Sequence, residues 1–163
     1  MTRALACIAA LLATEAAALD CSGPDLDLAL ATLAQAVEAG EPPVLLHGQV
    51  SLDESRFPDR APWLWPWQDD SGRIPAPPVP ARLVGVRLGP EGPVPFDGEF
   101  RVEPSCYASD DCGFLPEGTH LLYAEDTARG LVVAAGPCGG AGFLDAEPAL
   151  VARFAACMAG DGC

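Results

Sequence analysis

Apolar residues recur every three or four positions in the segment that follows Pro24, which is the spacing of one face of an α-helix. Ser22 or Asp25 can cap this helix at its start, and Gly40 ends it before two prolines. The apolar face consists of Leu26, Leu30, Leu33 and Val37. We expect this face to pack against a sheet.

From residue 44 onward the period falls to two, which is typical of strands with one buried face. The predicted strands span 44–52, 81–88, 99–103, 120–125 and 131–135. In the first strand the even-numbered positions share the face predicted to be buried, whereas Leu45, His47, Gln49 and Ser51 share the exposed face. The link 126–130 between the last two strands has the size of a hairpin turn.

Asp145 is predicted to cap a last helix, whose apolar face presents Leu150, Val151, Phe154 and Met158. Five strands with a helix at each end predict an α+β or small β-barrel fold.

The segment 53–78 breaks both periods and forms a predicted Pro/Trp-rich insertion loop. It holds Trp63, Trp65 and Trp67, all the tryptophans of the chain, among its prolines. Loops of this length are usually functional or disordered. The tryptophans either offer rigid contact area to a sugar, a peptide or another protein, or fold back as a lid over one end of a barrel. The pattern leaves both interpretations open.

The first 18 residues have the three parts of a secretory signal peptide: Arg3, an apolar run over 4–13, and the small residues 16–18. Cleavage after Ala18 leaves residues 19–163 as a single exported domain, periplasmic or secreted, with no membrane insertion. Lipidation at Cys21 is the alternative, but Asp20 places a charge where a small residue is expected.

The chain has seven cysteines, and Cys7 falls within the predicted signal peptide. The remaining six are Cys21, Cys106, Cys112, Cys138, Cys157 and Cys163. An even number in an exported chain predicts a disulfide framework, and six cysteines allow 15 pairings. A zinc site is the competing interpretation. No pair is spaced Cys-x-x-Cys and neither histidine has a ligand-like neighbour, so disulfides are favoured.

The formal net charge is −14. Such a chain repels phosphate backbones and anionic lipid headgroups. Nucleic acid is therefore excluded as a partner class.

The other candidate chemistry is weak, and we expect neither an enzyme nor a cofactor. No serine lies in a Gly-x-Ser-x-Gly elbow. His47 falls on the predicted exposed face of its strand, and His120, which can neighbour it across a barrel, makes at best a chance pair. Asp110 and Asp111 are too few for a calcium site, which needs six or more oxygens. The glycine-rich run 136–142 lacks the spacing of a phosphate loop.

Several short motifs resemble one known family. They are Val44–Val50 (VLLHGQV), Cys112-Gly113-Phe114, a turn at Gly118, the apolar run 121–124, and 130–133 leading to Cys138. Together they resemble the netrin-like module, which tissue inhibitors of metalloproteinases share with bacterial secreted relatives. The resemblance implies a five-stranded OB-type barrel with flanking helices over residues 19–163, the same strand count as the periodicity.

The resemblance also implies a disulfide from Cys21 to Cys112 or Cys138, with the other three cysteines supplying further bridges. In the animal inhibitors the first mature residue is a cysteine that chelates the zinc of the protease, commonly in a Cys-x-Cys opening. Here Cys21 is followed by Ser-Gly, and predicted cleavage leaves two residues ahead of it. Inhibition by that route is therefore disfavoured.

The favoured function is a non-catalytic binding module that recognises a protein or a glycan through Trp63, Trp65 and Trp67. A metalloproteinase-inhibitor-like protein and a structural or assembly protein of the envelope are the alternatives.

Overall fold

The computed structural model describes residues 24–57, 74–108, 111–136 and 142–163. The predicted signal peptide, Cys21, the three tryptophans, Asp110 and Cys138 lie outside these ranges.

The described residues form two helices, a short 3-10 turn and eight strands. The helices are α1 (Leu26–Glu38) and α2 (Pro148–Ala159), and the turn is η1 (Glu54–Arg56). The longer strands are β1 (Val44–Leu52), β3 (Val79–Gly89), β4 (Gly92–Ala108), β6 (Gly118–Thr127) and β7 (Gly130–Ala135). The short strands are β2 (Ile74–Pro75), β5 (Asp111–Cys112) and β8 (Gly142–Leu144).

The five longer strands form a closed sheet. Their order is β1-β3-β4-β7-β6, and β6 pairs again with β1. The pairing of β4 with β7 is parallel, and the other four pairings are antiparallel. Of the short strands, β2 and β5 pair with β4, and β8 pairs with β6. The protein is therefore mostly β, with five strands in closed order.

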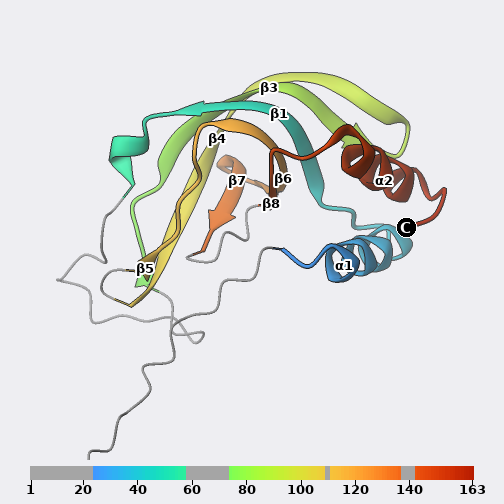
Figure 1. Cartoon of the computed structure of the whole chain (residues 1–163), viewed down its shortest axis with the longest axis horizontal. Helices are drawn as coiled ribbons and strands as arrows, with labels where there is room; N and C mark the ends of the chain where they lie inside the picture. The colour runs from blue at the N-terminus through green and yellow to red at the C-terminus, as the bar shows by residue number, and fades with distance from the viewer. Residues whose placement is uncertain (1–23, 58–73, 109–110, 137–141) are drawn as a thin grey trace, which may run out of the picture.

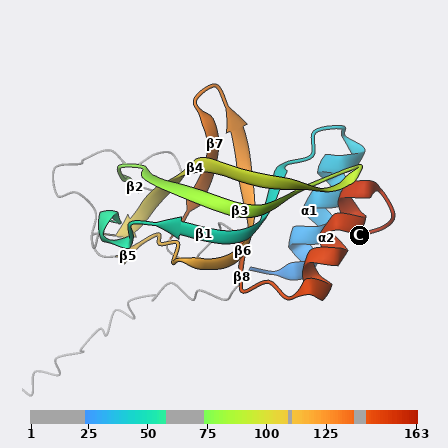
Figure 2. The ribbon, with the colours of Figure 1, turned by 90° about the horizontal axis from the view of Figure 1, so that it is seen from above.

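The core has two layers, one inside the closed sheet and one between its outer face and the helices. The inner layer contains Val44, Leu46, Val50, Phe57, Val79, Ala81, Leu83, Phe100, Val102, Leu115, Leu122, Ala124, Val133 and Ala135. The outer layer contains Leu30, Leu33, Leu45, Leu88, Leu121, Ala146, Phe154, Cys157 and Met158. Figures 1 and 2 show α1 and α2 side by side at one end of the molecule, away from β2 and β5.

The first helix and the first strand lie where the periodicity predicts them. Asp25 is the N-cap of α1, because its Oδ1 accepts a hydrogen bond from the Leu28 amide at 3.0 Å. The strand β1 has the predicted bounds. Its predicted exposed face is wrong at Leu45, which is fully buried because the helices cover that end of the outer face.

Two other predictions need correction. The strand predicted at 99–103 is the middle of the 17-residue β4, whose start is hidden in the sequence by prolines and glycines. Asp145 does not cap the last helix, because Glu147 is the N-cap of α2 and makes no side-chain capping bond. Asp145 instead has a left-handed backbone, with φ of 46°.

The backbones of β1 and β3 touch where Gly48 is paired with Gly85. A Cβ atom added to Gly48 would lie 2.7 Å from the Gly85 Cα, and one added to Gly85 would lie 2.6 Å from the Gly48 Cα. Neither position has room for a side chain. This close approach lets the two strands bend together as the sheet closes.

We expect Gly48→Ala to destabilise the fold by about 2 kcal/mol, because the methyl group meets backbone atoms that cannot move aside. Gly89→Ala is the matched control, since an added Cβ there has its nearest neighbour at 3.7 Å. Urea unfolding of both variants measures the difference. Equal free energies of unfolding would show that the contact between β1 and β3 does not constrain the sheet.

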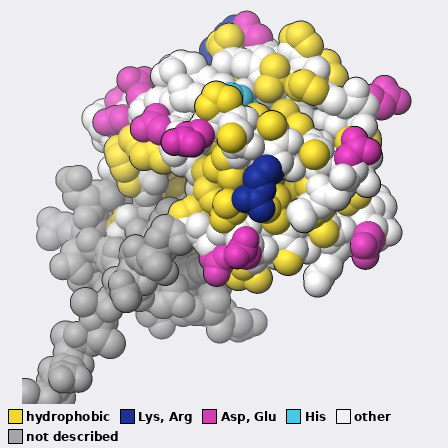
Figure 3. Space-filling view, turned by 45° about the vertical axis from the view of Figure 1, so that its right-hand side comes forward, with side chains coloured by type: hydrophobic (Ala, Val, Ile, Leu, Met, Phe, Trp, Pro, Cys, Tyr) yellow, Lys and Arg dark blue, Asp and Glu magenta, His cyan; other side chains and the backbone are white. Residues whose placement is uncertain are grey.

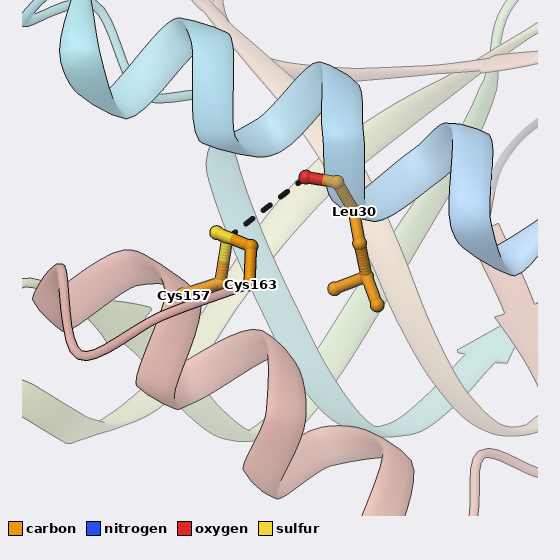
Figure 4. Close-up of a disulfide and its surroundings, with 3 residues drawn as sticks. All are labelled: Leu30, Cys157 and Cys163. Atoms are coloured by element: carbon orange, nitrogen blue, oxygen red, sulfur yellow. Dashed lines mark hydrogen bonds between the residues drawn. A yellow bond between two sulfur atoms is a disulfide. The ribbon is translucent and has the colours of Figure 1, made fainter.

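A disulfide joins Cys157 in α2 to Cys163. In Figure 4 the Cys157 Sγ lies 4.0 Å from the Leu30 carbonyl oxygen of α1. A disulfide sulfur carries no hydrogen, so this is a packing contact and not a hydrogen bond. The bridge ties the end of the chain to the junction of the two helices.

Replacing the exposed Cys163 by Ser opens this bridge and leaves the buried Cys157 sulfur in place. We expect a loss of about 2 kcal/mol in unfolding free energy, the chain-entropy value for so short a loop. Asp161→Ser, on the same turn, is the control. Thermal unfolding of both oxidised proteins tests this, and a Cys163→Ser midpoint equal to that of wild type would contradict it.

The second described disulfide joins Cys106 to Cys112. Cys112 is therefore not the partner of Cys21, and the alternative pairing with Cys138 lies outside the described residues. The two bridges indicate an oxidising, extracytoplasmic environment. Neither described helix has the length and apolar character that crossing a bilayer requires.

Candidate functional site

Residues 113–117, which connect β5 to β6, are hydrogen-bonded to β4 at one end and to the end of β1 and η1 at the other. The Gly113 amide donates to the Ser105 carbonyl of β4 at 2.9 Å. At the other end of the segment, the Glu117 amide donates to the Glu54 carboxylate at 2.9 Å, and the Glu117 carboxylate accepts from the Leu52 amide at 3.1 Å. The segment is thereby held against the end of β1.

A cavity of about 190 Å³ lies beside this segment. It is lined by Pro24, Phe114, Leu115, Pro116, His120, Leu122, Gly142 and Leu144. All but one of these residues are apolar, so the cavity is suited to an apolar group.

His120 is the one polar residue in the lining and is only 1% exposed. Its Nε2 lies 2.9 Å from the Pro116 carbonyl oxygen. Because a carbonyl oxygen only accepts, Nε2 carries the hydrogen in the neutral ring. Burial lowers the pKa of His120, and the Pro116 bond and the Asp145 charge oppose this less strongly. The imidazole is thus a neutral structural donor that holds the segment 113–117.

Two large apolar side chains at the rim of the cavity are exposed to solvent. Phe114 is 45% exposed and Leu144 is 56% exposed. Leu144 and Pro24 also line a second, shallower hollow next to the first, which includes the acidic residues Asp145 and Glu147. The rim therefore combines exposed apolar surface with negative charge. Exposed apolar surface around a hollow is typical of an interaction site. We call these two hollows and their rim the apolar end.

The described ends of the tryptophan-containing segment lie close to the apolar end. Phe57, the last described residue before it, packs edge-on against Phe114 with ring centroids 5.0 Å apart. Ile74, the first described residue after it, pairs with Cys106, which is bridged to Cys112. Trp63, Trp65 and Trp67 themselves lie outside the described residues.

The two histidines do not form a pair. His120 is opposite Gly48 in the β1–β6 ladder, whereas His47 is opposite Leu121. Adjacent positions point to opposite faces, so the two rings lie on different sides of the sheet. The prediction that His47 is simply exposed is wrong, because its Nε2 is buried and burial lowers its pKa.

No grouping of metal-binding side chains occurs within the described ranges. Sequence reasoning used Phe114 as part of a family motif and did not single it out for binding. Leu144 gave no signal, because nothing in its local pattern separates it from a core residue.

The buried neutral His120 gives stability a pH dependence. Its pKa is lower in the folded state than the ordinary 6.5, so as the pH falls the unfolded chain binds the proton first. We expect the free energy of unfolding to be highest above pH 6.5 and to fall below it, by at most about 1.4 kcal/mol per pH unit from this group.

His120→Gln keeps an amide donor for Pro116 and should flatten this dependence between pH 7.5 and 5.5. Denaturant unfolding across that range is the measurement. His47→Gln, measured in parallel, accounts for the other histidine. An unchanged slope in the His120 variant would refute a buried neutral imidazole.

Comparison with family models, curated proteins and solved structures finds no match to this chain. The resemblance to the netrin-like module therefore rests on the sequence motifs alone.

Proposed function

We propose that this protein is an exported, non-catalytic binding module that recognises another protein through its apolar end. One observation carries the proposal: Phe114 and Leu144 stand 45% and 56% exposed on the rim of an apolar cavity. Side chains of this kind stabilise a complex when a partner removes them from water. The chain functions in the periplasm or outside the cell.

The proposal includes an OB-type barrel of the netrin-like kind. In its support, the strand order is β1-β3-β4-β7-β6, closed by β6 on β1, with a single parallel pairing between β4 and β7. The tryptophan segment then belongs to the connection between the first two barrel strands, a position where OB folds bind ligands. Both its described ends lie near the apolar end, and on this proposal Trp63, Trp65 and Trp67 contact the same partner.

The charge of the chain favours a basic protein as partner. Asp145 and Glu147 line the second hollow, and the net charge is −14. Figure 3 shows acidic side chains scattered over one face, where basic ones are few. A partner with an apolar side chain among Lys or Arg residues complements this surface in both respects.

Phe114→Ser combined with Leu144→Ser should weaken capture of the partner from an envelope extract at least tenfold, because each large side chain contributes on the order of 1.5 kcal/mol or more when buried. The matched control is Leu28→Ser with Val94→Ser, two apolar side chains that are more exposed and line neither hollow. Quantitative mass spectrometry of the retained proteins measures the effect. Equal retention by both double variants would refute recognition at the apolar end.

Replacing Trp63, Trp65 and Trp67 together by Ala tests the segment separately. We expect the same partner to be lost from the extract while the thermal midpoint stays near that of wild type. An unchanged set of retained proteins would exclude the tryptophans from the surface. Retention that is abolished by free oligosaccharide would show a glycan ligand in place of a protein.

A further inference from the structure

A third hollow, with different chemistry, opens where β4 and β7 separate. Their parallel pairing begins at Arg101 and Val132, and ahead of that point the β6–β7 hairpin projects from the sheet, as Figure 2 shows. The hollow has a volume of about 400 Å³. Its lining comprises Pro80, Glu99, Phe100, Arg101, Arg129, Gly130 and Leu131.

Arginines are scarce in this chain, yet two of them line this hollow. The whole sequence has nine basic residues against 23 acidic ones. Arg101 comes from β4, and Arg129 comes from the turn between β6 and β7. The two arginines that line the hollow therefore come from different elements of the sheet.

The Nε and Nη2 atoms of Arg101 are buried and have no hydrogen-bond partner. These two nitrogens form one side of the guanidinium, where their N–H bonds run parallel and match the two oxygens of a carboxylate. Buried donors normally have acceptors, so an unpaired fork is exceptional.

Nearby acidic residues do not fill this role. Glu99 and Glu103 flank Arg101 on the same face of β4, but neither forms an ion pair with it. Within the described ranges, the arginine that is ion-paired is Arg82, at 2.6 Å from Asp97. Because Arg101 Nε and Nη2 have no acceptor, turning the guanidinium into the hollow breaks no hydrogen bond made by these atoms.

We propose that this hollow is a binding site for a carboxylate group, held in a two-point hydrogen bond by Arg101 and neutralised further by Arg129. A carboxylate carries a single negative charge, so an acidic chain with Glu99 at the site repels it less than a divalent oxyanion. Leu131 and Phe100 give the hollow an apolar side, which suits the carbon chain of the ligand. This site is separate from the apolar end and does not depend on it.

The test follows the Nε–H signals of the arginines by ¹H–¹⁵N NMR in the oxidised mature protein, with sodium acetate as the probe. We expect the Arg101 signal to move downfield and saturate, whereas sodium chloride at equal ionic strength leaves it in place. Arg82, already paired with Asp97, is the internal control and should not respond. No saturable shift of Arg101 in acetate would overturn the proposal.

Two variants separate the contribution of the paired Nε and Nη2 donors of Arg101 from that of positive charge alone. Arg101→Lys keeps the charge but loses the parallel donors, so the response of the Arg129 signal to acetate should weaken at least tenfold. Arg129→Gln, at an exposed turn, should weaken the Arg101 response about threefold. Unfolding midpoints near wild type establish that both variants fold.

Sulfate distinguishes the two kinds of oxyanion. Tighter binding of sulfate than of acetate would overturn the carboxylate assignment, and unchanged acetate binding by Arg101→Lys would overturn the role of the fork. Weaker binding of sulfate supports the proposal.

Discussion

The closure of the sheet on β1 is the constraint on which the rest of the structure depends. β1 pairs with β3 on one side and with β6 on the other, so any side chain on its inner face competes for space with both neighbours. At the middle of β1 the row across the sheet reads Gly85, Gly48, His120. The two glycines let the backbones meet, and the residue opposite Gly48 on the other side is a buried histidine. The position of His120, and through its bond to Pro116 the position of the segment 113–117, follows from this arrangement.

The helices complete the fold by covering part of the outer face. Leu45 of β1 and Leu121 of β6 belong to the same outer layer as Phe154 and Leu33, one from each helix. The Cys157–Cys163 bridge holds the end of α2 at the same junction. One end of the closed sheet therefore has a second apolar layer. At the other end, where β2 and β5 lie, the Cys106–Cys112 bridge joins β4 to β5.

Local periodicity predicted the elements in which one face is buried along the whole length. It failed where the burial of a residue depends on contacts with segments that are distant in sequence. The helix after Asp25 and the strand Val44–Leu52 were predicted with close to their observed bounds because their patterns are uninterrupted. The burial of Leu45 was missed because the helices that cover it are distant in sequence. The pairing of Cys106 with Cys112 and the hollow at Arg101 depend on strand register, which no local pattern specifies. Phe114 was visible as part of a motif, but its exposure is a property of the assembled end.

The closed order of the five longer strands also affects how the two candidate sites can bind a partner. The five longer strands pair in a closed order, so backbone groups along their paired stretches are not available to add a partner strand. Both candidate sites use side chains, one at an end of the sheet and one at a place where neighbouring strands diverge. The apolar cavity lies beside the start of β6, and the Arg101 hollow lies ahead of the first pairing of β4 with β7. One site is apolar and the other is cationic, so they are suited to different chemical groups. A single partner could present both an apolar side chain and a carboxylate, or two ligands could bind independently. Acetate competes with protein binding in the first case and does not compete in the second.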